Sequence, residues 1–123
     1  MYKSEYRKVE PYRVEIKYPI VPVGGANYLK VEVYYALGGY NYFTSKSEKR
    51  GYYLSISPVE IKSIDGKFNC ESYTAFTGYK FLLFEASRKS QKSMEKAIDM
   101  FNNTHMDYIK QYFSQYEMIQ EED

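Results

Sequence analysis

Alternation of apolar and polar residues over the first two thirds of the chain limits the possible folds more than any other feature. The clearest examples run from Tyr12 to Tyr18 and from Leu29 to Leu37, where every second residue is apolar or aromatic. A period of two is typical of strands with one face in the core and the other toward solvent. Further strand-like stretches are Tyr40 to Thr44, Tyr52 to Ser57, Val59 to Lys62, Phe68 to Phe76 and Tyr79 to Ala86.

Turn signals separate these stretches. Pro19 and Pro22 end the first strand, and Gly24 to Asn27 supplies a flexible turn before the second. Pro58 predicts a strand end, an edge or a bulge, because proline donates no backbone hydrogen bond. Further turns are expected at Asp65-Gly66 and Thr77-Gly78. The strands are therefore joined by short connections.

Helical periodicity begins only near the C-terminus. From Met94 to Tyr116 apolar residues recur at steps of three and four, which predicts an amphipathic helix. Asn102 to Thr104 favours caps, and Thr104 with Asp107 resembles an N-terminal capping signal, so one kinked helix or two are expected. Without helices between the strands, parallel βαβ units are excluded. The pattern predicts an α+β fold, with an antiparallel sheet of about five strands packed against C-terminal helix.

The strand from Tyr79 to Ala86 is apolar on both faces, which predicts a central, covered position in this sheet. The composition favours one globular domain over residues 1–123. The chain has 123 residues, of which 44% are apolar and 27% are charged. We expect residues 1–10 and 119–123 to fray.

The balance of charge narrows the possible partners. Seventeen Lys and Arg oppose sixteen Asp and Glu, so long-range attraction to nucleic acid or to an anionic membrane must come from a local patch. Cys70 is the only cysteine, which suits a reducing compartment. No apolar run has the length of a signal peptide or of a membrane span. We therefore expect a cytoplasmic protein that does not insert into membranes.

Catalytic chemistry has few candidate residues. His105 is the only histidine and lies within the apolar stripe of the predicted helix, which favours a structural role. The one available nucleophile and base pair is Cys70 with His105, oriented by Glu71 or Glu85, and its members lie on separate elements. A structural zinc ion needs more Cys and His ligands than the chain offers. The sequence thus predicts a protein that is not an enzyme and has no metal or cofactor.

The first candidate binding surface is a predicted hairpin that bends at Gly38-Gly39. Its polar tip carries the cations Lys46, Lys49 and Arg50, and its flanks carry Tyr40, Tyr42, Tyr52 and Tyr53. Cations can hold phosphates while bases stack on tyrosine rings, a combination suited to single-stranded nucleic acid. The alternative is a charged tip that only keeps the hairpin soluble, and Glu48 dilutes its positive charge.

The second candidate surface lies at the start of the predicted helix. Arg88, Lys92 and Lys96 are spaced four residues apart, so a helix would bring them onto one face as a ridge able to follow phosphates or an acidic protein. A solvated helix face is the alternative. The sixteen tyrosines also have a simple explanation, because tyrosine favours strands.

The stretches Gly38-Gly39-Tyr40-Asn41-Tyr42-Phe43-Thr44, Lys49-Arg50-Gly51-Tyr52-Tyr53-Leu54 and Ser57-Pro58-Val59 suggest a family. With the neighbourhood of Arg88-Lys89-Ser90, the sequence resembles small uncharacterised bacterial proteins encoded on plasmids and other mobile elements. The resemblance implies no activity or functional residue. We therefore expect a non-enzymatic accessory module that binds single-stranded nucleic acid, or alternatively a protein-interaction or self-assembly module that uses exposed tyrosines or a sheet edge near Pro58.

Overall fold

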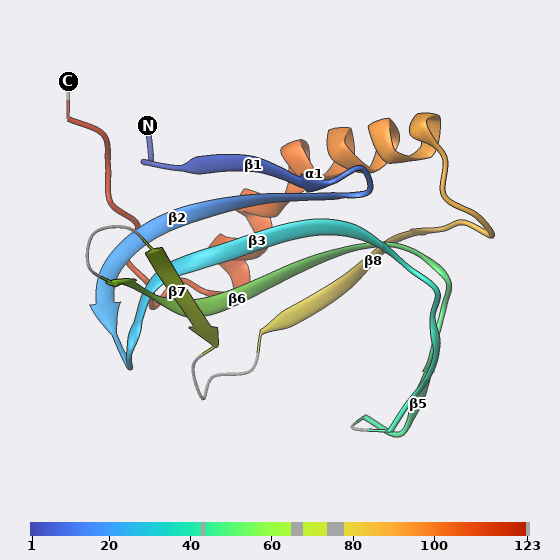
Figure 1. Ribbon diagram of the computed structural model, residues 1–123, viewed down its shortest axis with the longest axis horizontal. Coiled ribbons are helices and arrows are strands. Elements are labelled where there is room, and N and C mark those ends of the chain that lie inside the picture. The colour runs from blue at the N-terminus through green and yellow to red at the C-terminus, as the bar shows by residue number, and fades with distance from the viewer. Residues whose placement is uncertain (43, 65–67, 74–77, 123) are drawn as a thin grey trace.

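The computed structural model describes residues 1–42, 44–64, 68–73 and 78–122 (Figure 1). The expected turn at Asp65-Gly66 and residues 74–77 lie outside this range. The described elements are β1 (Glu5–Glu10), β2 (Arg13–Val23), β3 (Ala26–Ala36), β4 (Gly39–Asn41), β5 (Lys46–Glu48), β6 (Gly51–Ile64), β7 (Phe68–Tyr73), β8 (Tyr79–Glu85) and α1 (Gln91–Tyr112).

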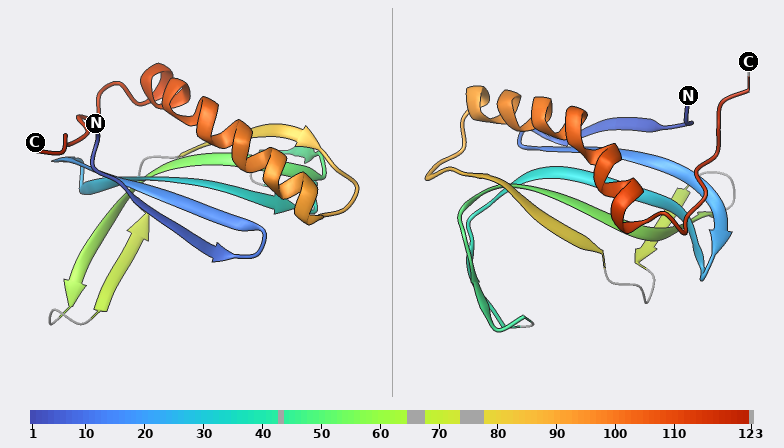
Figure 2. Two further views of the ribbon diagram at one scale, coloured as in Figure 1. Left: turned by 90° about the horizontal axis from the view of Figure 1, so that it is seen from above. Right: turned by 180° about the vertical axis from the view of Figure 1, so that it is seen from behind.

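The main sheet is antiparallel throughout and has the order β1-β2-β3-β6-β7, with β8 also paired to β6. It curls as a half-barrel, and α1 packs across one face against β3, β6 and β8 (Figure 2). The short strands β4 and β5 form a separate hairpin. The predicted class, α+β with an antiparallel sheet and a C-terminal helix, is confirmed.

β6 is long enough to serve two partners along one edge. On one side it pairs with β3, and on the other with β8 through residues 51–56 and with β7 through residues 59–64. Pro58 lies where the second edge changes partner, a position that tolerates a residue without a backbone N–H. The predicted interruption at Pro58 is therefore confined to one edge, while the strand itself continues.

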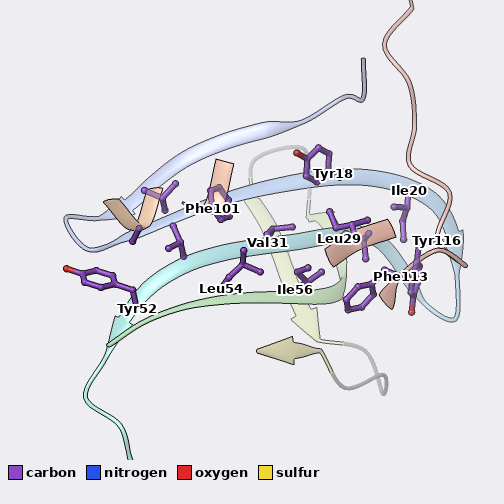
Figure 3. Packing of buried hydrophobic residues seen from close by; sticks show 14 of the residues in the cluster. Tyr18, Ile20, Leu29, Val31, Tyr52, Leu54, Ile56, Phe101, Phe113 and Tyr116 are labelled. Carbon is purple, nitrogen blue, oxygen red and sulfur yellow. The ribbon is translucent and has the colours of Figure 1, made fainter. Parts of the chain in front are cut away.

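The core lies between α1 and the apolar face of β2, β3 and β6 (Figure 3). Its buried strand residues include Val14, Tyr18, Ile20, Leu29, Val31, Val33, Tyr52, Leu54 and Ile56, and its helix residues are Met94, Ala97, Phe101 and Ile109. Phe113 and Tyr116 extend the core past the end of α1. Removal of this contiguous apolar surface from water is the main force that holds helix and sheet together.

The position of β8 differs from the prediction. Among the described strands it pairs only with β6, so it is not a central strand. Its two apolar faces have different surroundings: the Phe81 ring stacks on Tyr108 of α1 with 4.2 Å between centroids, whereas Leu82 is 41% exposed on the opposite face. The prediction that this strand is central and covered on both faces, made from its apolar pattern, is therefore wrong.

α1 is one continuous helix of 22 residues, so the alternative of two helices is wrong. Ser90 is its N-cap, and the hydroxyls of Ser90 and Ser93 accept hydrogen bonds from each other's backbone N–H groups. Thr104 donates its hydroxyl to the carbonyl of Met100 at 2.6 Å, so it bonds within the helix instead of capping a second one. No described helix combines the length and the apolarity needed to cross a bilayer.

Both ends of the chain contact the sheet or each other. Residues 5–10, which lie in the segment expected to fray, form β1 and pair with β2. The isolated bridges Tyr2 to Gln120 and Ile20 to Met118 attach the C-terminal segment to the N-terminal segment and to β2.

Almost every side chain of β1 is exposed, and an edge strand of this kind produces no apolar alternation in the sequence.

Candidate functional site

The hairpin of β4 and β5 leaves the main sheet where β3 ends. Gly38 and Gly39 have φ angles of +74° and +109°, in the region that residues with a Cβ rarely adopt. A Cβ on Gly38 would also lie 2.6 Å from the carbonyl oxygen of Glu48. The predicted bend at this glycine pair is confirmed, and the hairpin projects on the side of the sheet away from α1 (Figures 1 and 2).

Arg50 anchors the base of the hairpin. Its Nε donates to the carbonyl of Leu37 at 3.2 Å and its Nη1 to the carbonyl of Ser87 at 3.4 Å, while the residue remains exposed. The side chain thus connects both ends of the hairpin to the segment after β8. Arg50 is a positioning residue as well as an exposed cation.

Tyr40 and Tyr42 are the exposed rings of the hairpin. Tyr40 is 53% exposed and Tyr42 is 85% exposed. Their ring centroids lie 4.8 Å apart with an interplanar angle of 75°, an edge-to-face arrangement. Rings this exposed contribute little to the core, so stability alone does not explain them. They form a small aromatic platform at the tip of the hairpin.

The three cations predicted at the tip do not lie together there. Lys46 begins β5 and is exposed, whereas Lys49 follows β5 at the base of the hairpin, beside Arg50. Lys49 lies 3.6 Å from Glu85, with more than 60% of each side chain in solvent, where an ion pair is weak. The carboxylate of Glu48 instead accepts hydrogen bonds from Lys80 and Asn41, which lower its pKa. Glu48 is therefore neutralised by Lys80 and does not offset the charge of Lys46 or Lys49.

Tyr52 and Tyr53 do not flank the hairpin as exposed rings, and this part of the prediction is wrong. Tyr52 is fully buried beneath α1, with its hydroxyl 2.7 Å from Oγ of Ser93. Tyr53 is 5% exposed; its hydroxyl donates to the carbonyl of Lys49, and Lys80 lies over its ring. Both faces of β6 are covered here, so neither ring can stack on a base.

The predicted ridge of Arg88, Lys92 and Lys96 does not form as a helical face. α1 begins at Gln91 after the N-cap Ser90, so Arg88 precedes the helix. Lys92 and Lys96 lie one turn apart on α1 and are exposed, with the ammonium of Lys96 4.4 Å from the ring centroid of Phe84. Two helical cations remain, too few for a coherent track.

The face of the main sheet away from α1 carries a lattice of charges. Direct cross-strand pairing places Glu15 opposite Glu32 and Lys17 opposite Lys30, so like charges face each other. Opposite charges nearby offset the repulsion within each of these pairs. The Lys30 ammonium lies 3.8 Å from its diagonal neighbour Glu15 on β2 and 3.6 Å from Glu32 on its own strand. Both glutamates are buried, where an unpaired carboxylate would be costly.

Glu71 of β7 completes this charge lattice, which we define as Glu15, Lys17, Lys30, Glu32 and Glu71. Its carboxylate lies 3.1 Å from the Lys17 ammonium and also accepts a hydrogen bond from Lys30. Burial opposes ionisation of Glu71, but these hydrogen bonds outweigh it and lower its pKa. Two strands, β3 and β6, lie between β2 and β7. On a flat sheet the side chains would project in parallel and could not meet across two strands. The contact between Glu71 and Lys17 therefore reflects the curl of the sheet.

A cleft of about 320 Å³ opens beside the charge lattice, and we call it the concave cleft. Arg13 pairs with Glu32 and lies 4.5 Å from the ring centroid of Tyr34. The cleft is also lined by Ser55, Ser57, Tyr73 and Lys80. Sequence reasoning missed the cleft, although polar residues alternating along β2 and β3 marked the face on which it lies.

The residues considered for catalysis do not form a nucleophile and base. Nδ1 of His105 bonds to the carbonyl of Phe101 and its Nε2 to the hydroxyl of Tyr18, each at 2.6 Å, so both nitrogens are occupied in the core. Cys70 is exposed on β7, and Glu71 belongs to the charge lattice. Within the described range, His, Cys, Asp and Glu side chains form no group of three suited to a metal ion.

Together the fold and the surfaces define a class: an α+β half-barrel with helix on one face and, on the other, a polar cleft and a projecting aromatic hairpin. No protein-family model, curated protein or solved structure matches the chain.

Proposed function

We propose that this protein is a non-enzymatic accessory module that binds single-stranded nucleic acid through the β4–β5 hairpin. One observation carries the proposal: two exposed rings, Tyr40 and Tyr42, lie on a projecting hairpin that carries the exposed cation Lys46 on β5 and the exposed cation Lys49 at its base. A strand with unpaired bases offers a partner to both kinds of group.

The physical roles of these groups differ. The ammonium groups attract phosphates without regard to sequence, and the tyrosine rings stack on bases, each of which has a flat face. Because the whole chain has a formal net charge of only +1, attraction is local to the hairpin and is screened by salt. Binding is therefore expected to be modest, tolerant of sequence and strongly dependent on ionic strength.

A purely protective role for the hairpin explains less. Charged tips do keep strands from pairing with other chains, which would account for Lys46 and Lys49. It would not account for Tyr42, whose ring is 85% exposed, since an exposed aromatic ring works against solubility. The combination of rings and cations favours a ligand.

Self-assembly through a sheet edge has weaker support. Pro58, near which the sequence suggested a sheet edge, is buried within β6, and β6 pairs with β3 on one side and with β7 and β8 on the other. The edge strand β1 is dominated by charged side chains, including Glu5, Arg7 and Lys8, which disfavour pairing with a second copy. We therefore keep nucleic acid as the proposed ligand. We also propose a cytoplasmic location, because the exposed thiol of Cys70 would stay reduced there.

Fluorescence anisotropy with a labelled single strand of mixed sequence tests the electrostatic half of this proposal. We expect micromolar binding at low salt, with a slope of log affinity against log salt of about −2 for three phosphate contacts. Replacing Lys46 and Lys49 together by Ala should weaken binding and make the slope shallower by about 1.4, because two of the three contacts are lost.

The matched control for that experiment replaces Lys3 and Lys110, two exposed lysines outside the hairpin, by Ala. The control changes the net charge by the same amount and should leave most of the affinity in place. An equal loss in both variants would mean that overall charge, and not the hairpin, attracts the strand, and would refute the proposal.

A further inference from the structure

We infer that the concave cleft accepts one base of a bound single strand, so that the strand runs from the hairpin onto the polar face of the half-barrel. The inference rests on the proposed function and deepens it, because it assigns a second contact surface and predicts a dependence on bases and not only on phosphates. Four features of the described residues support it.

The cleft and the hairpin are continuous. Lys80 lines the concave cleft and also a groove of about 420 Å³ under the hairpin, whose other walls include Leu37, Tyr40 and Tyr42. The groove and the cleft therefore adjoin at Lys80, which a ligand that spans both would contact. The hairpin projects on the side of the sheet away from α1 (Figure 2). The cleft is lined by Arg13, Glu32 and Ser55, which lie on this same polar face of β2, β3 and β6.

Every cation beside the cleft already has a carboxylate partner. Arg13 pairs with Glu32, and Lys80 pairs with Glu48. At the edge of the charge lattice, Lys30 pairs with Glu71. A phosphate would have to compete with these carboxylates, whereas Lys46 on the hairpin is exposed and the pair of Lys49 with Glu85 is weak. The cleft therefore suits a neutral group of the ligand.

The lining of the cleft offers flat rings and neutral hydrogen-bonding groups. Tyr73 is 65% exposed, and Ser55 and Ser57 contribute hydroxyls that donate and accept. Burial raises the pKa of Tyr34 to about 12, so its hydroxyl stays protonated and able to donate at neutral pH. Rings with neutral donors and acceptors are the groups that recognise a heterocyclic base.

The cleft also has a floor of paired strands and sufficient room. Ser55 of β6 pairs with Glu32 of β3 on one side and with Lys80 of β8 on the other, and all three residues line the cleft. A volume of about 320 Å³ lies at the lower end of small-molecule sites, which run from roughly 300 to 1,000 Å³. One base fits such a cleft, and a stack of several does not.

Two labelled strands of equal length and charge test the inference, one with bases of mixed sequence and one made of abasic units, each about 12 nucleotides long to match typical single-strand sites. The cleft variant is Tyr73→Ala, chosen because an exposed ring can be removed without damage to the core. The matched control is Tyr6→Ala on β1, whose ring is 57% exposed. Affinities are measured by anisotropy at low salt.

We expect Tyr73→Ala to weaken binding of the base-bearing strand by about tenfold, the usual effect of losing one stacked base, and to leave the abasic strand unchanged. Tyr6→Ala should change neither. If wild-type protein binds the base-bearing strand and Tyr73→Ala binds it equally well, the cleft is not a base site, while the proposed function stands. If wild-type protein binds neither strand at low salt, both the proposed function and this inference fail.

Discussion

The hydroxyl of Tyr18 on β2 lies 2.6 Å from Nε2 of His105 on α1. Because the carbonyl of Phe101 can only accept, Nδ1 of His105 carries the proton, and Nε2 therefore accepts from Tyr18. The pair connects helix and sheet within the core, and burial lowers the pKa of His105 below its ordinary value of 6.5.

This lowered pKa predicts a loss of stability in weak acid. Below pH 6.5 the unfolded chain protonates at His105 while the folded protein resists, so the free energy of unfolding falls as pH falls, by at most about 1.4 kcal/mol per pH unit. Urea denaturation at pH 7.5 and 5.5 measures the effect. His105→Gln should lose most of this dependence, since the chain has no other histidine. Equal stability of wild-type protein at both pH values would contradict the assignment.

Glu71→Gln should destabilise the protein by about 1–2 kcal/mol at pH 7, because it removes the carboxylate that pairs with Lys17 and Lys30. The lowered pKa of Glu71 means that this stabilisation is present above pH 4.5 and is lost on acidification below it. Chemical denaturation of both proteins at pH 7 and pH 3.5 tests the expected convergence. Glu60→Gln, at a more exposed ion pair with Lys62, should cost less than about 0.5 kcal/mol.

Gly51→Ala should destabilise the protein by about 2–3 kcal/mol, since a Cβ there would lie 2.2 Å from the carbonyl oxygen of Phe84 and would push β8 from β6. Thermal unfolding followed by circular dichroism measures the change. Gly24→Asn is the control: its φ of +59° is one that Asn adopts, and a Cβ meets nothing within 4 Å. A melting temperature of Gly51→Ala equal to that of the wild type would show that the two strands are not so close.

Ser90→Ala should cost about 1 kcal/mol, because it removes the acceptor for the N–H of Ser93 at the start of α1. Guanidinium unfolding monitored by helical circular dichroism gives the value. Ser87→Ala, an exposed serine before the cap, is expected to behave as wild type. A Ser90→Ala protein as stable as Ser87→Ala would mean that the capping box contributes nothing.

The elements with a buried face were predictable from sequence. Alternation from Tyr12 to Tyr18 and from Leu29 to Leu37 lies within or overlaps β2 and β3, and the helical pattern after Met94 marks α1. β1 was missed because its exposed side chains carry no apolar period. Local pattern also cannot distinguish an edge strand covered by a helix from a central strand, and this accounts for the error in β8.

The candidate site was predictable in part. Tyr40, Tyr42, Lys46 and Lys49 follow from turn chemistry and composition, because the hairpin is local in sequence. The concave cleft and the charge lattice depend on the curl of the sheet, which brings Glu71 to Lys30 across 41 positions of the chain. The same long-range packing buries Tyr52, and no property of the hairpin sequence specifies it.

The central claim is that the rings of Tyr40 and Tyr42 hold a single strand, and an anisotropy titration of the double variant Tyr40→Ser and Tyr42→Ser tests it most directly. With one stacked base lost at each ring, we predict affinity for a mixed-sequence strand about a hundredfold weaker than wild type, while Tyr6→Ser, which removes an exposed ring from β1, binds as wild type. Wild-type affinity in the double variant would contradict the account.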